Sequence, residues 1–199
     1  MKAIKPKIVG LILAGGYSRR MGQDKALLDF HGVPQIEFVN DLLLHFCDKI
    51  FLSKRSDQNN YKRIASIDDS EEYANHGPLS GILSAMKSYP DVSWLVIACD
   101  LPNINANVIQ NLLENRNPNA IATAYKSSID VLPEPLCAVW EGHSYSSILA
   151  LFNQGIHCPR KILIKSNVHL LNQKDIHWLD NVNTLEEYEQ FNKHKMQGG

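Results

Sequence analysis

The sequence lacks three features that would assign a protein to a broad functional class. The first missing feature is a large net charge, because 20 Lys and Arg residues against 21 Asp and Glu residues leave a formal charge of −1. There is no global basic field to hold nucleic acid or an acidic membrane, so neither partner is expected. An apolar run near the roughly 20 residues of a membrane span is also missing, and so is a signal peptide. These absences lead us to expect a cytoplasmic protein.

Cysteine and histidine are present without the spacings that bind metals. The four cysteines, Cys47, Cys99, Cys137 and Cys158, are far apart, and no Cys-x-x-Cys pair occurs. A disulfide framework or a structural zinc site needs closer or paired cysteines. The eight histidines show no His-Glu-x-x-His pattern. The sequence therefore predicts neither disulfides nor soft-metal chemistry.

What the sequence does contain is a loop rich in glycine and cations. Two adjacent glycines follow the apolar residues 8–13, and three cations follow within ten residues: Arg19, Arg20 and Lys25. Glycine lets the backbone approach a ligand and point its N–H groups at it, so the loop suits a triphosphate. The spacing matches neither the dinucleotide fingerprint nor the P-loop. A tight turn with solvated arginines is the alternative interpretation.

Strand patterns alternate with amphipathic helix patterns along the chain. The predicted strands are residues 8–13, 49–53, 64–67, 94–98, 120–124 and 136–140, the last one after a proline break at 133–135. The predicted helices start near Pro34, at Pro78, before Val108 and at Thr184, where Glu187 completes a capping box. This alternation predicts a single domain, residues 1–199, folded as a three-layer α/β/α sandwich around a Rossmann-like, mostly parallel sheet.

Asp100 is the strongest single candidate for a functional residue. It follows the strand predicted at 94–98, as the glycine loop follows the strand at 8–13. Ligands of open sheets bind beyond the carboxyl ends of the strands, so both features are expected to face one site. A carboxylate at a strand end is often a helix N-cap, but Leu101-Pro102 keep the chain out of a helix here. Mg²⁺ takes one or two carboxylates together with substrate phosphates, so Asp100 is the candidate metal ligand.

Residues 13–28 resemble the signature loop of a known enzyme family. They read Leu-Ala-Gly-Gly-x-Ser-x-Arg-Met-Gly-x-Asp-Lys-Ala-Leu-Leu, which is similar to the loop of the nucleotidyltransferases that attach a nucleotide to the molybdenum cofactor, the guanylyltransferases above all. Four further segments agree in order: Gly77–Gly81, Cys99–Pro102, Pro133–Ala138 and Asn181–Thr184. The resemblance covers nearly the whole chain, and it implies the fold of the nucleotide-diphospho-sugar transferases.

The resemblance also implies a reaction and a nucleotide-binding set. The reaction is transfer of GMP from GTP to the phosphate of molybdopterin, with Mg²⁺ as cofactor and pyrophosphate as the leaving group. Lys25 would contact the phosphates, Arg20 would neutralise charge as pyrophosphate leaves, and Asp100 would hold the metal; these three are the predicted catalytic residues. The implied nucleotide contacts are Leu13, Ala14, Gly15, Gly16, Lys25, Asp69 and Asp100.

The acceptor end of the site is less well defined by the sequence. Arg160, Asn181 and Asn183 are candidate contacts to the pterin or to a second metal. A solvated turn around Arg160 and helix-start chemistry at Thr184 are the alternatives. Ser53 departs from the guanine-selective pattern, which has asparagine there. Handover of a fragile cofactor also suggests cofactor-delivery and molybdoenzyme-chaperone proteins as partners.

Three alternatives to GMP transfer stay open from the sequence. A related enzyme could use CTP on the same acceptor, and another could act on a sugar or alcohol phosphate. A regulator that binds a nucleotide without chemistry is the alternative outside the enzymes. Retention of Arg20, Lys25 and Asp100 together argues against a regulator, since binding alone does not need a metal at the α-phosphate.

Overall fold

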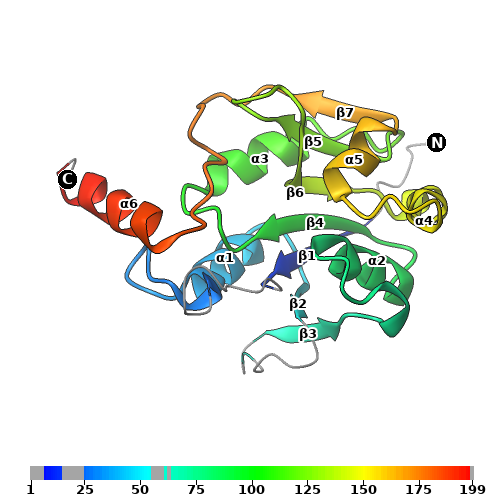
Figure 1. Ribbon diagram of the computed structural model, residues 1–199, viewed down its shortest axis with the longest axis horizontal. Coiled ribbons are helices and arrows are strands. Elements are labelled where there is room, and N and C mark those ends of the chain that lie inside the picture. Colours follow the sequence, from blue (N-terminus) through cyan, green and yellow to red (C-terminus); the bar gives the residue numbers. More distant parts are fainter. Residues whose placement is uncertain (1–6, 15–24, 55–60, 62–63, 198–199) are drawn as a thin grey trace.

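The computed structural model describes residues 7–14, 25–54, 61 and 64–197, which form a twisted sheet covered by helices (Figure 1). Within these residues, seven strands lie in the order β3-β2-β1-β4-β6-β5-β7. Strand β6 is antiparallel to both of its neighbours, and the other pairs are parallel. The strand bounds are β1 Ile8–Leu13, β2 Ile50–Lys54, β3 Ala65–Asp68, β4 Ser93–Ala98, β5 Ala122–Lys126, β6 Pro133–Trp140 and β7 Val168–Leu171.

The helices cover both faces of this sheet. Their bounds are α1 Gln35–Leu44, α2 Pro78–Ser88, α3 Ala106–Glu114, α4 Tyr145–Asn153, α5 Pro159–Ile164 and α6 Leu185–Gln197, with short 3₁₀ turns at Lys25–Leu27, Glu71–Tyr73 and Gly142–Ser144. Helices α1 and α3 pack in one hydrophobic cluster with one face of the sheet, and α2, α4 and α5 pack in a second cluster on the other face. This arrangement is the predicted three-layer α/β/α sandwich.

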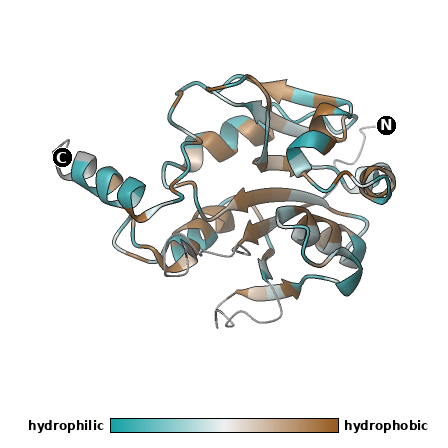
Figure 2. Ribbon diagram, viewed as in Figure 1, coloured by the Kyte–Doolittle hydropathy of each residue, from teal (hydrophilic) through white to brown (hydrophobic). Residues whose placement is uncertain are grey.

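The core explains why the central strands read as continuous apolar runs. All six residues of β4 are buried, because helices cover this strand on both sides. Figure 2 shows the same distribution, with hydrophobic residues along the strands and on one side of the helices. Among the described residues, no helix is both long enough and apolar enough to cross a membrane.

The helix ends follow local sequence signals. Pro34 is the N-cap residue of α1 and not part of its first turn, so the helix starts one residue later than the sequence predicts. At α6 the predicted capping box is present, since the backbone N–H of Glu187 donates to Thr184 Oγ1 at 3.2 Å and that of Thr184 to Glu187 Oε2 at 3.2 Å. Helix α6 then continues past Phe191 and projects from the body of the molecule (Figure 1).

The predicted break at residues 133–135 is wrong. Strand β6 starts at Pro133 and includes Pro135. Proline is tolerated at strand ends and bulges, where its missing N–H removes no ladder bond. Pro133 pairs with the last residue of β5, and Pro135 lies where the register between β5 and β6 shifts. The prolines therefore shape the start of β6 instead of ending the preceding structure.

Three elements have no counterpart in the sequence prediction: α4, α5 and β7. Helix α5 has six residues and β7 has four, which is too short for a clear periodic pattern. The segment around Arg160, for which a solvated turn was an alternative, is the first turn of α5 with Pro159 at its start. Strand β7 completes the sheet, and the start of α5 contributes Pro159 and Arg160 to the wall of the pocket.

Candidate active site

A pocket of about 320 Å³ lies beyond the carboxyl end of β4, beside the start of β6, which pairs with β4. Because β6 is antiparallel, its first residues lie where β4 ends. Cys137 pairs with Ile97, so residues 134–136, which precede Cys137, lie toward the carboxyl end of β4, where Asp100 follows. This is the end of the strands at which open α/β sheets bind ligands.

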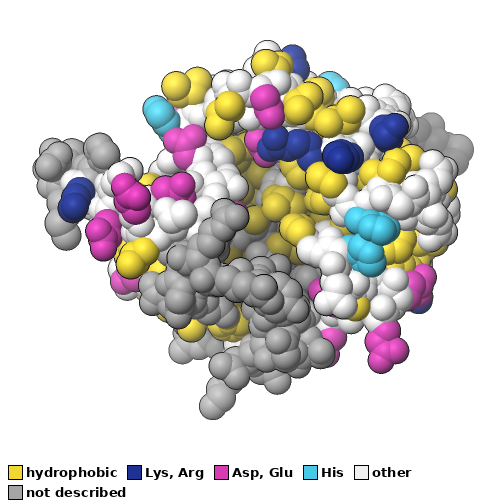
Figure 3. Space-filling view, viewed as in Figure 1, with side chains coloured by type: hydrophobic (Ala, Val, Ile, Leu, Met, Phe, Trp, Pro, Cys, Tyr) yellow, Lys and Arg dark blue, Asp and Glu magenta, His cyan; other side chains and the backbone are white. Residues whose placement is uncertain are grey.

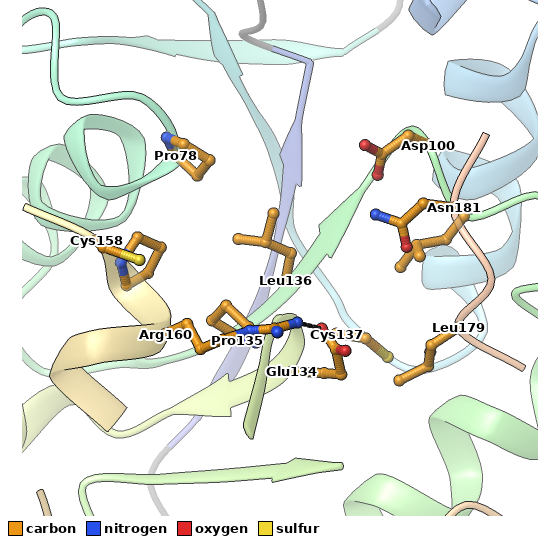
Figure 4. Close-up of a pocket in the computed structure, with 12 residues that line it drawn as sticks. Pro78, Asp100, Glu134, Pro135, Leu136, Cys137, Cys158, Arg160, Leu179 and Asn181 are labelled. Atoms are coloured by element: carbon orange, nitrogen blue, oxygen red, sulfur yellow. Dashed lines mark hydrogen bonds and ion pairs between the residues drawn. The ribbon is translucent and has the colours of Figure 1, made fainter. Parts of the chain in front are cut away.

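The pocket combines apolar walls with two separate polar groups. Figure 3 shows the hollow, lined with hydrophobic side chains and bordered on one side by basic ones. Pro135, Leu136 and Leu179 are among the apolar lining residues. Figure 4 shows the polar groups at different sides of the pocket: Asp100 with Asn181, and Glu134 with Arg160.

Asp100 and Asn181 are brought together by a backbone contact between distant segments. The N–H of Val182 donates to the backbone carbonyl of Asp100 at 3.0 Å. The Asn181 side chain therefore lies beside the Asp100 carboxylate, and both line the pocket. The sequence predicted both residues for the site, and only the fold shows that they are neighbours.

The turn that carries Asp100 is held from the side of α1. Gln35, which is fully buried, donates through Nε2 to the carbonyl of Leu101 at 3.1 Å. His31 Nε2 lies 2.9 Å from the carbonyl of Pro102. These two contacts fix the backbone directly after Asp100. Sequence reasoning missed both residues, although a polar Gln35 at the start of an apolar helix face was a usable signal.

Arg160 lies between two carboxylates on the other side of the pocket. Its Nη1 is 3.0 Å from Asp130 Oδ2, and its Nη2 donates to Glu134 Oε2 at 2.7 Å. The backbone N–H of Leu132 and the charge of Arg160 hold the pKa of Asp130 below its usual value. The sequence predicted Arg160 as a site residue but gave Glu134 no role, because a glutamate between two prolines read as part of a break.

The predicted nucleotide residues Leu13, Ala14 and Asp69 lie at the ends of β1 and β3 and are not among the residues that line the pocket. Leu13 ends β1, and the Ala14 N–H donates to the carbonyl of Ser53 at 3.3 Å. The Ser53 hydroxyl donates to Asp69 Oδ1 at 3.3 Å. Ser53 is also covered by α2, since a Cβ atom on Gly81 would come within 2.0 Å of its Oγ. The small residues at positions 53 and 81 therefore let α2 approach the ends of β1 and β2.

Several predicted residues are not described or lie apart from the pocket. Gly15, Gly16 and Arg20 lie outside the described residues, and so does the side chain of Lys25. Asn183 is not among the residues that line the pocket; its backbone N–H donates to Glu187 Oε2 at 2.6 Å at the start of α6.

The pocket offers oxygen ligands for a hard cation. Among the residues that the structure describes, no three His, Cys, Asp or Glu side chains gather into a metal-binding group. Burial raises the pKa of the Cys137 thiol in the pocket wall, which keeps it a protonated packing residue. The carboxylate of Asp100 suits Mg²⁺, which keeps several waters and binds one or two carboxylates together with substrate phosphates. In Figure 4 the amide nitrogen of Asn181 faces Asp100, so its amide must turn over to bring its oxygen to the same ion.

Comparison with known proteins identifies the family. Residues 10–170 match the MobA-like NTP transferase domain. The chain belongs to this family. The family is one of nucleotidyltransferases, and the match confirms the resemblance inferred from the loop at residues 13–28 and from the later segments.

Three relatives illustrate the match. A molybdenum cofactor biosynthesis bifunctional protein from Synechocystis is 37% identical over 93% of this chain; the chain spans 54% of that protein, about half its length. A probable molybdenum cofactor guanylyltransferase from Bacillus cereus strain Q1 is 31% identical over 94% of this chain and 96% of its own length. The crystal structure of molybdopterin-guanine dinucleotide biosynthesis protein A from Archaeoglobus fulgidus superposes with a TM-score of 0.74 at 23% identity, covering 95% of this chain and 99% of that one. At this identity the structural match shows that the fold is shared.

Proposed function

We propose that this protein transfers GMP from GTP to the terminal phosphate of molybdopterin and releases pyrophosphate, forming molybdopterin guanine dinucleotide. The observation that carries the proposal is the pocket at the sheet edge, where Asp100 and Asn181 lie together in a chain of the MobA-like family. The curated relative from Bacillus cereus bears the name of this activity.

The reaction needs positioned charges more than a base. An oxygen of the acceptor phosphate bonds to the α-phosphorus of GTP, and the bond from that phosphorus to the bridging oxygen breaks, with pyrophosphate taking the electron pair. The attacking phosphate is already anionic at neutral pH, so no strong general base is required. Phosphoryl chemistry of this kind depends on alignment and on neutralising the phosphate charge.

Each side chain of the proposal has a role in that alignment. Asp100, with the amide oxygen of Asn181, would hold Mg²⁺, and the bound ion supplies positive charge to the phosphates. Lys25 and Arg20 would neutralise the triphosphate and the leaving pyrophosphate. Loss of one cation aimed at reacting phosphates is expected to lower the rate by roughly 10²–10³.

The remaining proposed contacts divide between donor and acceptor. Backbone groups of residues 13–16 and the carboxylate of Asp69 would bind the nucleotide. Arg160 and Asn181 would contact the acceptor from within the pocket. Asn183 remains a candidate for the acceptor or a second metal, through its place beside Asn181 in the chain.

A single assay tests the reaction and the base. Purified protein is offered GTP, CTP or ATP with Mg²⁺ and molybdopterin, and pyrophosphate and dinucleotide product are measured. We expect product with GTP. A preference for CTP would overturn the guanine assignment. CTP is included because Ser53 stands where the guanine-selective pattern has asparagine. Tight GTP binding without turnover on any acceptor would support a nucleotide-binding regulator.

Substitution of Asp100 tests the mechanism. We expect Asp100→Ala to abolish measurable turnover while the protein stays folded, because Val182 contacts the backbone carbonyl of Asp100 and not its side chain. Asp91→Ala is the matched control, since Asp91 is exposed in the turn before β4, at the opposite edge of the sheet. Thermal unfolding and circular dichroism report on folding, and unchanged turnover in Asp100→Ala would remove this carboxylate from the mechanism.

A further inference from the structure

The pocket extends beyond the residues that the phosphate chemistry needs. Under the proposed function, the acceptor phosphate reacts beside Asp100. Glu134 and Arg160 lie at a different side of the pocket, with Leu136 between the two polar groups (Figure 4). An acceptor whose phosphate reaches Asp100 would therefore direct the rest of its structure along the apolar walls toward Glu134.

Glu134 has hydrogen-bonding capacity left for a ligand. Arg160 donates to its Oε2 at 2.7 Å, while Oε1 accepts no hydrogen bond from the described residues. Its side chain is 22% exposed, at the pocket wall. An ionised carboxylate has about four acceptor positions and no donor, so the group that completes it must carry N–H or O–H donors.

The charges of Arg160 and its two carboxylate partners argue against a second phosphate directly at Glu134. Arg160 contributes one positive charge, and Asp130 and Glu134, both within 3.0 Å of it, contribute two negative charges. The cation is thus already balanced, and the group as a whole is negative. A neutral, flat, donor-rich ring is favoured over an anion, since Pro135 and Leu136 supply apolar contact next to the carboxylate.

We propose that Glu134, held in position by Arg160, recognises the 2-amino-4-oxopyrimidine ring of the acceptor's pterin. This inference rests on the proposed function. The ring N3–H and the 2-amino group are adjacent donors that point in the same direction, and a carboxylate accepts both at once. Arg160 uses two of its five donors on Asp130 and Glu134, so further N–H groups remain for the 4-oxo oxygen.

Guanine presents the same hydrogen-bonding edge as a pterin, a ring N–H beside a 2-amino group. The strand order places the proposed guanine site and the proposed pterin site on different sides of β4. Leu13, Ser53 and Asp69, at the ends of β1 and β2 and just after β3, lie on one side of β4, and Glu134 lies on β6 at the other side. The proposed nucleotide contacts belong to the first side. The Glu134 end is therefore left for the ring of the acceptor.

Binding of two small pteridines tests this directly. Pterin carries the 2-amino group, whereas lumazine has a second carbonyl there, which would face the carboxylate of Glu134 with an acceptor. Affinities are measured by the fluorescence of each compound. We expect the wild-type protein to prefer pterin about tenfold to a hundredfold, the range for hydrogen bonds to a charged group.

Variants separate recognition from a structural role. Glu134→Gln keeps the size of the side chain and can still accept from Arg160, but offers an amide N–H₂ to the ligand; we expect it to lose the preference for pterin or to reverse it toward lumazine. Glu72→Gln is the matched control, because it removes a partner of an exposed Lys–Glu pair away from the pocket. Its preference should equal that of the wild type. Thermal unfolding checks that both variants fold.

The outcomes distinguish this inference from the proposed function. Equal binding of pterin and lumazine by the wild type, or an unchanged preference in Glu134→Gln, would overturn it even if dinucleotide is formed. Displacement of pterin by GTP, together with loss of GTP affinity in Glu134→Gln, would overturn it in favour of guanine at this position. A pterin preference that depends on Glu134 would support it even if the protein makes no product from any nucleotide, a result that refutes only the proposed reaction.

Discussion

Two arginine–glutamate pairs lie at opposite ends of β6, and they differ in how far the protein buries them. Arg116 donates through Nε to Glu141 Oε1 at 2.7 Å and through Nη2 to Oε2 at 2.6 Å, with side chains only 2% and 0% exposed. The pair of Arg160 and Glu134 has similar contact distances, but its side chains are 33% and 22% exposed in the pocket wall.

In the buried pair of Arg116 and Glu141, which we call the sealed pair, protein groups supply all the hydrogen bonds to the carboxylate. Ser93, at the start of β4, donates to Glu141 Oε2 at 2.7 Å and lies 2.8 Å from Arg116 Nη2. The network joins the ends of α3, β4 and β6. Both oxygens of Glu141 are used within the protein, whereas Oε1 of Glu134 accepts no hydrogen bond from the described residues. Under the inference above, that oxygen takes a ligand, and the difference between a structural pair and a ligand-binding pair is this open acceptor.

Removing Glu141 should produce the largest effect on stability. Glu141→Ala leaves Arg116 buried without its carboxylate, which we expect to lower the free energy of unfolding by about 3–5 kcal/mol. Glu134→Ala, the matched change in the open pair, should lower it by no more than about 1 kcal/mol. Urea unfolding of both variants measures the difference. Equal losses would mean that exposure does not separate the roles of the two pairs.

Removing Arg160 should affect acceptor use more than folding. We expect Arg160→Ala to lower kcat/KM for molybdopterin by about tenfold to a hundredfold, with little change in KM for GTP, because Glu134 loses the guanidinium that positions it. Arg160→Lys should recover only part of the loss, since a single ammonium group cannot reproduce the planar fork that contacts two carboxylates. Steady-state kinetics with each substrate varied in turn measure both values. A rise in KM for GTP as large as that for the acceptor would argue against two separate ends of the site.

A third, fully exposed pair should give the smallest effect. His177 Nδ1 lies 2.7 Å from Asp180 Oδ2, and this hydrogen bond, followed by the charge of Asp180, raises the pKa of His177. Because the pKa of His177 is higher in the folded than in the unfolded state, the pair stabilises the folded protein fully below the unfolded pKa of about 6.5. This stabilisation is lost as the pH rises through the folded-state pKa. Titration of the His177 ring by NMR should show the raised pKa, and Asp180→Asn should return it toward the ordinary value. An identical titration curve in the variant would show that the pair does not act in solution.

Local sequence patterns predicted much of the fold, because the formation of a strand or helix depends largely on residues that are near neighbours in the chain. The strand at residues 8–13 and the capping box at Thr184 and Glu187 are confirmed, since apolar runs and side-chain caps act within a few residues. The place of Asp100 in the pocket wall agrees with the sequence prediction, because a carboxylate directly after a buried strand has a defined position at the end of that strand. Pro133 to Pro135 misled the prediction, because only the shifted register between β5 and β6 makes proline acceptable there.

The sequence by itself determined the alternation of strands and helices, the family and the position of Asp100 at a strand end. Tertiary structure alone decided that β6 runs antiparallel beside β4, which brings Glu134 to the same edge as Asp100. It also decided that Glu141 is sealed while Glu134 faces a pocket. The physical reason is that burial and hydrogen-bond satisfaction depend on segments far apart in the chain, whereas a local pattern carries information only about its own element.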